Sequence, residues 1–243
     1  SDGLSLKGEE LISFLKDADK IIIGLEKIDK TVLDNLPKLK LISKYGVGLN
    51  NINLEDVKER NIKLSFTPGV NKQSVAELAL MHILVSLRKT HMSLEDIKSG
   101  IWTQEKGNEL YKKTVGILGY GNIGRELRKM LKPFDNEVIV FDELDVNDKS
   151  VIQVTLEEIF SRSDIISIHL PLIESTKNII DERLLSIAKK NLKIINTSRG
   201  GIINEDDLYN FLNKNSNAFG GLDVFETEPC FSSKLMELKN FNA

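Results

Sequence analysis

One stretch, Thr114–Asp142 (TVGILGYGNIGRELRKMLKPFDNEVIVFD), constrains the possible folds of this chain most strongly. It contains two short apolar runs, Val115–Leu118 and Val138–Phe141, with the length and composition of buried strands. Between them, Ile123–Leu131 has the pattern of a helix. A strand, a helix and a second strand in this order predict a βαβ unit and therefore a parallel sheet.

The turn after the first of these strands carries Gly119, Gly121 and Gly124 in the spacing G-x-G-x-x-G. In a dinucleotide-binding turn, the first glycine permits the bend, the second lets a pyrophosphate approach, and the third lets helix and strand pack closely. Asp142 follows Gly124 by 18 residues, about where an acid binds the adenosine ribose. An ordinary βα turn is the alternative, but these features together favour a dinucleotide. The carboxylate favours NAD over NADP, whose 2′-phosphate it would repel.

The composition excludes several other classes of protein. The 243 residues suffice for one large or two modest domains, and 41% hydrophobic with 28% charged residues is typical of an ordinary globular protein. A net charge of −3 with interspersed signs argues against nucleic acid as the main partner. The single Cys230 excludes an intramolecular disulfide, and His82, His91 and His169 lie too far apart to predict a metal site. No membrane span or signal peptide is visible, so we expect a cytoplasmic protein.

The first part of the chain alternates short apolar runs with helical patterns. This βαβαβ rhythm predicts a second parallel sheet. The expected strands are Lys20–Gly24, Lys40–Lys44 and Ile62–Phe66, and the expected helices are Lys30–Leu36 and Leu54–Arg60.

A glycine loop follows the second of these expected strands. It reads Tyr45–Gly46–Val47–Gly48–Leu49–Asn50 and lies at the strand's carboxyl end, where open parallel sheets bind ligands. A plain turn explains this loop equally well on its own.

A long helix is predicted after the turn at Thr67–Asn71. Ser74 and Glu77 have the capping-box spacing, and Val75–Leu87 (VAELALMHILVSL) is apolar on almost every side. Such a helix must be buried on two faces, so we expect it to pack against a second subunit in a homodimer. A helix buried wholly within one subunit is the alternative. His82 lies in this helix and is interpreted as a packed or interface residue.

The next stretch, Lys89–Lys113, is polar and irregular and contains the lone Trp102. An arm that reaches over a partner subunit is one interpretation, which the sequence alone leaves open.

The remainder of the chain repeats the strand and helix rhythm and predicts a doubly wound sheet. Thr155 and Glu158 form another capping-box pattern before a short helix. The further strands are expected at Ile165–Leu170, Leu192–Asn196 and within Ala218–Phe225, and the further helices at Glu182–Lys189 and Glu205–Leu212.

Polar groups follow three of these strands, where the sheet itself does not require them. They are His169–Leu170–Pro171, the run Asn196–Gly201 with Arg199, and Asp223 with the later Glu226 and Glu228. All three should emerge at the same sheet edge as the glycine turn. A guanidinium there can bind a carboxylate through two hydrogen bonds. A surface ion pair and a solvated acidic loop are the simpler alternatives for single residues.

From about Asp19 onward, the chain resembles the D-isomer-specific 2-hydroxyacid dehydrogenases. The resemblance rests on six segments in this order: KYGVGLNN, TPGVNKQSVAELAL, TVGILGYGNIGRE, HLPL, INTSRGGIINE and GLDVFETEP. The motifs are highly specific in combination. The resemblance implies an α/β fold of two doubly wound parallel-sheet domains. Residues 1–71 would form a smaller, flavodoxin-like substrate domain, and residues 72–243 a Rossmann NAD-binding domain with the dimerisation helix at its start.

The resemblance also implies roles for individual residues. Arg199 matches the catalytic arginine that binds the carboxylate and carbonyl of the substrate, and Glu228, rather than Glu226, matches the catalytic glutamate. The implied cofactor-binding residues are Gly119, Gly121, Asn122, Ile123, Gly124, Asp142, His169, Leu170, Pro171, Thr176, Thr197, Ser198, Arg199 and Asp223. The implied substrate-binding residues are Gly46, Val47, Gly48, Asn71 and Arg199.

These roles imply a mechanism for a 2-hydroxy or 2-oxo acid. Hydride passes between NAD and C2, while Arg199 holds the carboxylate and polarises the carbonyl. An imidazole moves the hydroxyl proton, and Glu228 orients that imidazole and favours its charged form.

The chain departs from the family pattern at both ends. It reaches Asn242–Ala243 before the PH motif that carries the family's catalytic histidine, so either these residues belong to a longer chain or the chain is a fragment that lacks this histidine. His169 is assigned to the cofactor pocket instead. By the resemblance, the first strand and helix of the substrate domain are also missing from these residues, so the smaller domain is expected to be incomplete.

The substrate is predicted from local similarity. The TPGVNKQSVAEL segment and the KYGVG loop resemble phosphoglycerate dehydrogenase-like members most. However, the arginine that such enzymes often carry after the first strand is replaced by Ile23–Glu26, and Lys27 and Lys44 are the possible substitutes. Glycerate/hydroxypyruvate reduction is the alternative. An NAD-sensing binding protein without turnover is the alternative from another class.

Overall fold

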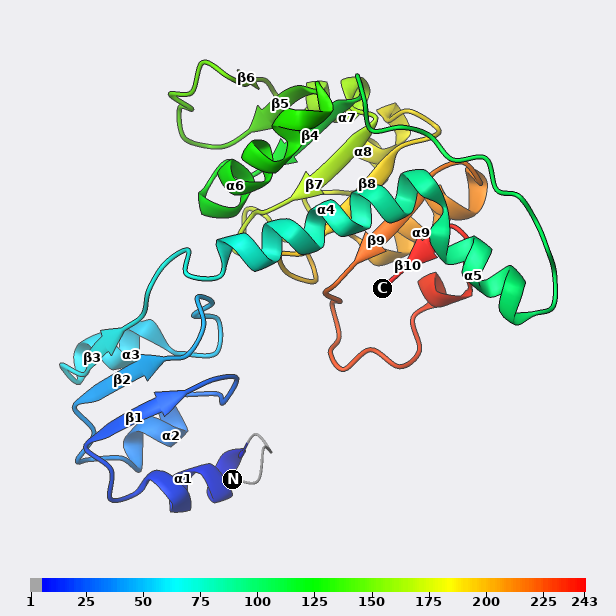
Figure 1. Cartoon of the computed structure of the whole chain (residues 1–243). Coiled ribbons are helices and arrows are strands. Elements are labelled where there is room, and N and C mark those ends of the chain that lie inside the picture. The colour runs from blue at the N-terminus through cyan, green and yellow to red at the C-terminus, as the bar shows by residue number, and fades with distance from the viewer. Residues whose placement is uncertain (1–5) are drawn as a thin grey trace. The chain divides into compact units, whose positions relative to one another are not determined.

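The computed structural model describes residues 6–243 of a chain that divides into two compact units, Ser1–Asn71 and Lys72–Ala243. Each unit is built on its own parallel β-sheet with helices packed against it (Figure 1). The α/β class with parallel sheets is therefore confirmed.

The smaller unit contains a three-stranded parallel sheet in the order β1-β2-β3. Its core forms because alternate side chains of β1 and β2, including Ile21, Ile23 and Ile42, point to one face, where helical side chains bury them. The elements are α1 Gly8–Leu15, β1 Lys20–Ile23, α2 Lys30–Asp34, β2 Leu41–Lys44, α3 Leu54–Glu59 and β3 Lys63–Ser65.

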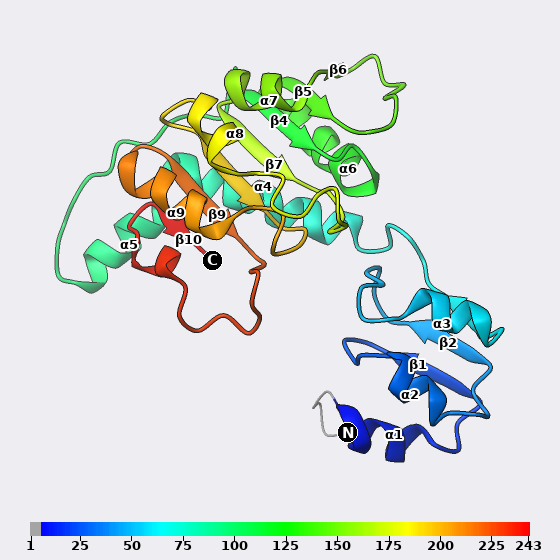
Figure 2. The ribbon, with the colours of Figure 1, turned by 180° about the vertical axis from the view of Figure 1, so that it is seen from behind.

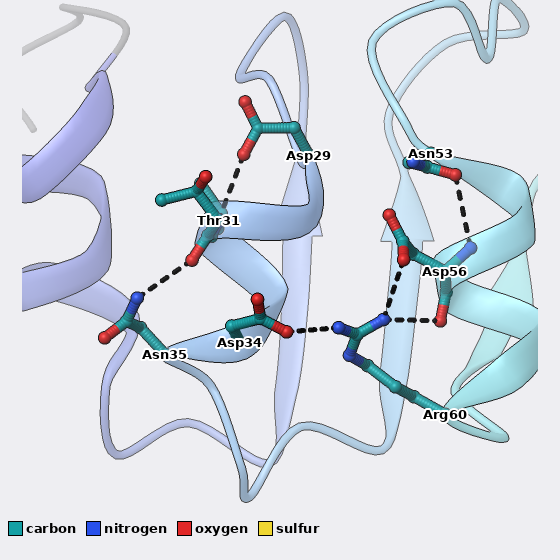
Figure 3. A network of polar contacts seen from close by, with 8 residues as sticks. Asp29, Thr31, Asp34, Asn35, Asn53, Asp56 and Arg60 are labelled. Carbon is teal, nitrogen blue, oxygen red and sulfur yellow. Dashed lines mark hydrogen bonds and ion pairs between the residues drawn. The ribbon is translucent and has the colours of Figure 1, made fainter.

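Polar contacts join the two short helices of this unit (Figure 3). The side chains of Asp29 and Asn53 cap α2 and α3, each accepting a backbone N–H three residues further on. At the end of α3, Arg60 donates to Asp56 at 3.0 Å and also forms an ion pair with Asp34 of α2. These contacts fix the helices that cover the sheet.

The larger unit contains a seven-stranded sheet in which every pairing is parallel. The strand order β10-β9-β8-β7-β4-β5-β6 reverses direction between β4 and β7, which is the topological switch point where doubly wound sheets bind dinucleotides. The strands are β4 Thr114–Leu118, β5 Glu137–Phe141, β6 Ile152–Gln153, β7 Ile165–Ile168, β8 Lys193–Asn196, β9 Phe219–Leu222 and β10 Phe241–Asn242.

Helices cover both faces of this sheet. One face packs against α4 and α6 (Figure 1), and the other against α7, α8 and α9, which lie in front when the molecule is turned (Figure 2). The helices are α4 Lys72–Arg88, α5 Thr90–Lys98, α6 Asn122–Leu131, α7 Leu156–Arg162, α8 Glu182–Ile187 and α9 Glu205–Lys214, with short 3-10 turns η1 Lys132–Phe134 and η2 Lys234–Glu237.

The predicted capping box of α7 is present. The Thr155 hydroxyl accepts the Glu158 N–H at 3.2 Å, and the Glu158 carboxylate accepts the Thr155 N–H at 2.9 Å. The second predicted capping box is wrong, because α4 begins at Lys72 and places Ser74 inside the helix. The carboxylate of Glu77 accepts instead from the side chain of Gln73, one helical turn earlier. The chain becomes helical directly after Asn71, before the residue that resembles a cap.

The stretch after α4 is more regular than its polar sequence indicates. Its first part forms α5, a helix without a buried residue, and only the remainder up to Lys113 is irregular. Leu94, Ile97 and Ile101 in this stretch are exposed, Trp102 is 89% exposed, and Leu110 is buried. The two-residue strands β6 and β10 were also not predicted, because so short a segment carries no periodicity of its own.

Among residues 6–243, the long helix α4 is buried on one side. Ala76, Ala79 and Ile83 are fully buried in the core beneath the sheet, whereas Met81 is 45% exposed. The predicted apolar character is therefore divided between a core face and an outer face.

Candidate active site

The glycine turn lies between β4 and α6, and its three glycines have different surroundings. Gly119 has a φ of +89°, and an added Cβ would lie 2.6 Å from the carbonyl oxygen of His169. A Cβ on Gly124 would lie 2.3 Å from the carbonyl oxygen of Gly119. Around Gly121, by contrast, no atom of residues 6–243 lies within 4 Å of the Cβ position. The first and third glycines are therefore required by packing, and the second leaves open the space that a pyrophosphate needs.

Asp142 lies directly after β5, next to this turn. One carboxylate oxygen accepts the Tyr120 N–H at 2.7 Å and the other accepts the Leu144 N–H at 3.0 Å. The aspartate thereby holds the glycine turn and its own loop together. Each of its oxygens retains a lone pair for a ribose hydroxyl.

Tyr120 is a residue of this region that the sequence reasoning missed. Its ring is buried, its hydroxyl donates to Asp148 at 2.9 Å, and Arg125 lies over the ring at 4.7 Å. Burial and then the bond to Asp148 raise the pKa of Tyr120 to about 12. The pKa of Asp148 falls to about 2, mainly through hydrogen bonds from Ser150. An aromatic residue between the first two glycines is the only sequence signal for this contact.

His169 follows β7, and its ring is neutral. Its Nε2 lies 3.0 Å from the Ser167 hydroxyl, and burial lowers the pKa of the imidazole to about 3. Its Nδ1 is buried without a hydrogen-bond partner among residues 6–243. A ring in this state can pack and accept a hydrogen bond, but it cannot supply a proton near neutral pH.

The loop after His169 contains Leu170, Pro171 and Thr176. Leu170 is buried in the core. The Thr176 hydroxyl donates to the Pro171 carbonyl at 2.6 Å and accepts the Ile173 N–H at 2.9 Å. The contacts of Thr176 therefore close this loop.

The loop that carries Arg199 follows β8 and is organised by Asn196. The Asn196 carbonyl oxygen accepts both the N–H and the hydroxyl of Ser198, at 3.0 and 2.7 Å, and its amide donates to the Arg199 carbonyl at 2.8 Å. The Arg199 guanidinium donates to the Ser198 carbonyl at 2.5 Å. The buried Thr197 hydroxyl has no hydrogen-bond partner among the described residues.

Gly200 connects the Arg199 loop to the loop that carries Glu228. An added Cβ on Gly200 would lie 1.8 Å from the Phe225 carbonyl oxygen, so the two backbones are in direct contact. The Phe225 N–H donates to the Glu228 carboxylate at 3.0 Å, and the Glu226 N–H donates to Glu205 of α9 at 2.6 Å. The arginine and the glutamate are therefore held on two loops that are in contact.

Asp223 follows β9 on the side of the sheet that α4 covers. Desolvation and the neighbouring Glu228 raise the pKa of Asp223, while His82 opposes this shift. His82 is 2% exposed in α4, as expected of a packed residue, and its Nδ1 lies 3.1 Å from the Cβ position of Gly221. His82 is thus electrostatically coupled to Asp223, which its sequence position alone did not indicate.

In the smaller unit, the predicted loop follows β2. Gly46 has a φ of +112° and open space at its Cβ position, and Val47 and Gly48 follow it. Lys44, at the end of β2, is buried and donates through its ammonium group to the Gly24 carbonyl. Asn71 is the last residue of this unit and is half-buried.

These residues fit NAD. The Cβ position of Gly121 is open next to a helix start, where backbone N–H groups point at a ligand, and Asp142 stands at the end of β5. The Thr197 hydroxyl and His169 Nδ1 are buried polar atoms that lack a partner among residues 6–243.

Two family models match this chain. The NAD-binding domain of the D-isomer specific 2-hydroxyacid dehydrogenases matches residues 80–243, and the catalytic domain of the same family matches residues 2–122. The chain belongs to this family. It is an NAD-dependent dehydrogenase family that acts on small 2-hydroxy and 2-oxo acids, and the cofactor is NAD.

Named relatives within the family have different substrates. The hydroxypyruvate reductase of Thermotoga maritima is 36% identical, and the match covers 97% of this chain and 79% of that protein. The D-3-phosphoglycerate dehydrogenase of Methanocaldococcus jannaschii is 35% identical over 97% of this chain but only 46% of that protein. The crystal structure of D-lactate dehydrogenase from Aquifex aeolicus with NAD and lactic acid has a TM-score of 0.85 at 28% identity, covering 95% of this chain and 76% of that one.

Two further features concern other classes of site. No helix within residues 6–243 is long and apolar enough to cross a membrane. No group of three or more metal-binding side chains is found in the same part of the chain.

Proposed function

We propose that the protein transfers a hydride between NAD and C2 of a D-2-hydroxy acid, most closely in the manner of a D-3-phosphoglycerate dehydrogenase. Residues 72–243 bind NAD, and residues 1–71 contribute substrate contacts. The observation that carries the proposal is the contact of Gly200 with Phe225, which joins the loop of Arg199 to the loop of Glu228.

The cofactor supplies a hydride acceptor or donor next to C2 when it is bound. Arg199 binds the carboxylate of the substrate and polarises the oxygen on C2, which fixes a reactive geometry. Glu228 orients the imidazole that moves the hydroxyl proton and favours its charged form. His169 does not fill this role, because burial lowers its pKa to about 3, so its ring does not hold a transferred proton near neutral pH, and its Nε2 lies 3.0 Å from the Ser167 hydroxyl.

The proposed cofactor contacts lie at the carboxyl edge of the large sheet. Gly121, Asn122 and Ile123 bind the pyrophosphate at the start of α6, and Asp142 binds the ribose. Thr197 and Asp223 line the nicotinamide side. The Thr197 hydroxyl without a partner and the open space at Gly121, both judged within residues 6–243, support these roles.

Lys44 supports the phosphoglycerate-type substrate. Its ammonium group lies at the carboxyl ends of β1 and β2, directly before the loop of Gly46, Val47 and Gly48. Lysine is a common point charge for phosphate. Lys27 is a weaker candidate, because it pairs with Asp29 at 3.3 Å.

Hydroxypyruvate or glyoxylate reduction is the second candidate. Glu26 favours it, because a carboxylate beside the Gly24 N–H repels a substrate phosphate. An NAD-sensing protein without turnover remains the candidate from another class.

A substrate panel distinguishes these proposals. NADH oxidation by the full-length protein is measured with 3-phosphohydroxypyruvate, hydroxypyruvate, glyoxylate and pyruvate. We expect the highest kcat/KM with 3-phosphohydroxypyruvate, and we expect Lys44→Gln to lower that value selectively. Preference for hydroxypyruvate or glyoxylate contradicts the phosphate role of Lys44. NADH binding without turnover of any substrate supports the sensor.

We further propose that the protein is a homodimer formed through the outer face of α4. A groove of about 420 Å³ lies there, lined mainly by Leu80, Met81, Leu84 and Val85. Its apolar side chains repeat every three to four residues, as in a helix that packs against another helix. A second copy of the chain offers the same apolar face and is the simplest partner for it.

A further inference from the structure

A second cavity of about 270 Å³ lies at the amino-terminal edge of the large sheet. Among its lining residues, Lys113 precedes β4, Asp164 precedes β7 and Lys193 begins β8. The strands are parallel, so this edge is opposite the one where Gly119 and Arg199 follow strand ends. At about 3.3 Å per residue, β8 alone separates the two edges by about 10 Å. The cavity is therefore distinct from the proposed cofactor and catalytic residues.

Positive charge dominates the lining of this cavity. Four lysines, Lys89, Lys106, Lys113 and Lys193, are among the lining residues, and Asp164 is the one acidic residue among the lining residues that the structure describes. Four like charges around one small space repel each other unless an anion lies among them.

The carboxylates near the cavity are already engaged. Asp164 accepts from Lys189 at 2.8 Å and from the Thr114 N–H at 3.0 Å, and its charge also acts on Lys113. Lys89 pairs with Glu105 at 3.3 Å. Those carboxylates therefore leave much of the lysine charge unbalanced.

Three lysines remain without a carboxylate partner in contact. Within residues 6–243, no ion pair joins Lys106, Lys113 or Lys193 to an acidic side chain. An anion in the cavity would be the contact partner that these ammonium groups lack.

Lys193 is the most unusual of the three, because it is only 8% exposed. Its ammonium group donates to the Asn217 carbonyl at 2.5 Å, which satisfies one of its three N–H donors. Burial and then the charge of Lys89 lower the pKa of Lys193 to about 8. A buried cation is costly unless it is paired, so an anion would stabilise its charged form.

We propose that this cavity binds a small anion with a tetrahedral phosphate group, held by Lys106, Lys113 and Lys193. Ammonium groups bind phosphate as point charges, and three of them around one space match its several oxygens. The volume also accommodates a short organic substituent, so the anion is either free phosphate or a small phosphomonoester. This site does not depend on the proposed catalytic function.

Isothermal titration calorimetry on the full chain tests the site. Inorganic phosphate and glycerol 3-phosphate are titrated separately into protein saturated with NADH, which fills the pyrophosphate site. We expect one binding event, weakened at least about tenfold in Lys106→Gln/Lys113→Gln because two charge-assisted contacts are lost. Tighter binding of glycerol 3-phosphate identifies a phosphomonoester, and equal binding identifies the free ion.

Lys112→Gln is the matched control, because Lys112 adjoins Lys113 but its ammonium group lies over the Tyr111 ring at 4.9 Å. We expect it to bind like the wild type. Absence of binding, or equal affinities in the control and the double variant, overturns the proposal.

A second measurement tests the buried lysine. Sulfate does not titrate near pH 8, so proton uptake on sulfate binding reports on the protein. We expect proton uptake by the wild type and its loss in Lys193→Met. Proton uptake is detected because the measured binding enthalpy then depends on the ionisation enthalpy of the buffer. Uptake that persists in Lys193→Met contradicts the role of this residue.

Discussion

Gly121 and Gly124 belong to one motif but lack a side chain for different reasons. Gly124 is required by the backbone, since a side chain there would collide with the Gly119 carbonyl. Gly121 has open space at its Cβ position, and we propose that a pyrophosphate occupies this space. The spacing of the motif does not distinguish the roles of the two glycines, whereas their structural surroundings do.

These surroundings predict opposite results for two alanine substitutions. Gly124→Ala should lower the free energy of unfolding by about 1–3 kcal/mol through overpacking. Gly121→Ala should fold normally but bind NADH more weakly. Thermal unfolding and NADH fluorescence titration of both variants provide the check, and a Gly121→Ala protein with wild-type NADH affinity would contradict the assignment.

Arg199 is predicted to act on the substrate rather than on protein stability or the cofactor. Arg199→Ala should lower kcat/KM by about 10²–10³ or more, as loss of a charge-stabilising donor does, with NADH affinity nearly unchanged. Arg199→Lys keeps the charge without the planar pair of donors and should recover only part of the activity. Equal losses of turnover and of NADH affinity would show that the proposed role is wrong.

At the scale of elements, α4 has two faces with separate consequences. Met81→Glu places a charge on the outer groove and should shift the protein from dimer to monomer without unfolding it. Sedimentation equilibrium measures this, with Ile187→Glu on α8 as a control at a similarly exposed apolar position. A Met81→Glu protein that remains dimeric would rule out this face as the interface.

The capping box of α7 is a second prediction at this scale. Thr155→Ala removes the hydroxyl that accepts the Glu158 N–H and should destabilise the protein by about 1 kcal/mol. Ser161→Ala, within the same helix, removes only an exposed bond at 3.3 Å and should have little effect. Urea unfolding compares the two variants, and similar midpoints would mean that the cap contributes no stability.

At the scale of the whole molecule, His169 links stability to pH. The folded state holds the pKa of His169 near 3, whereas the ordinary value is about 6.5. Between these values the unfolded chain binds a proton that the folded protein does not bind, so stability falls as pH decreases from 6.5 toward 3. Above pH 6.5 the ring is neutral in both states, so this loss of stability is absent.

His169→Gln should reduce that pH dependence. Urea unfolding of wild type and variant at pH 7.5, 6.0 and 5.0 gives the difference in unfolding free energy at each pH. We expect the unfolding free energy of the variant to rise relative to that of the wild type as pH falls. A constant difference would mean that the His169 ring titrates normally in the folded protein.

The sequence by itself determined the α/β class, the order of the main strands and helices, the glycine turn and the family. These features rest on local periodicity and on motifs in which spacing carries the chemistry. The edge strands β6 and β10 were decided by tertiary structure, because pairing with β5 and β9 forms them. Local pattern also did not indicate the start of α4 or the helix α5. Contacts between distant residues also give Gly121 and Gly124 different surroundings and bring Gly200 against Phe225. They gather the lysines around the cavity at the amino-terminal edge of the large sheet, because burial and charge proximity exist only once the strands lie side by side.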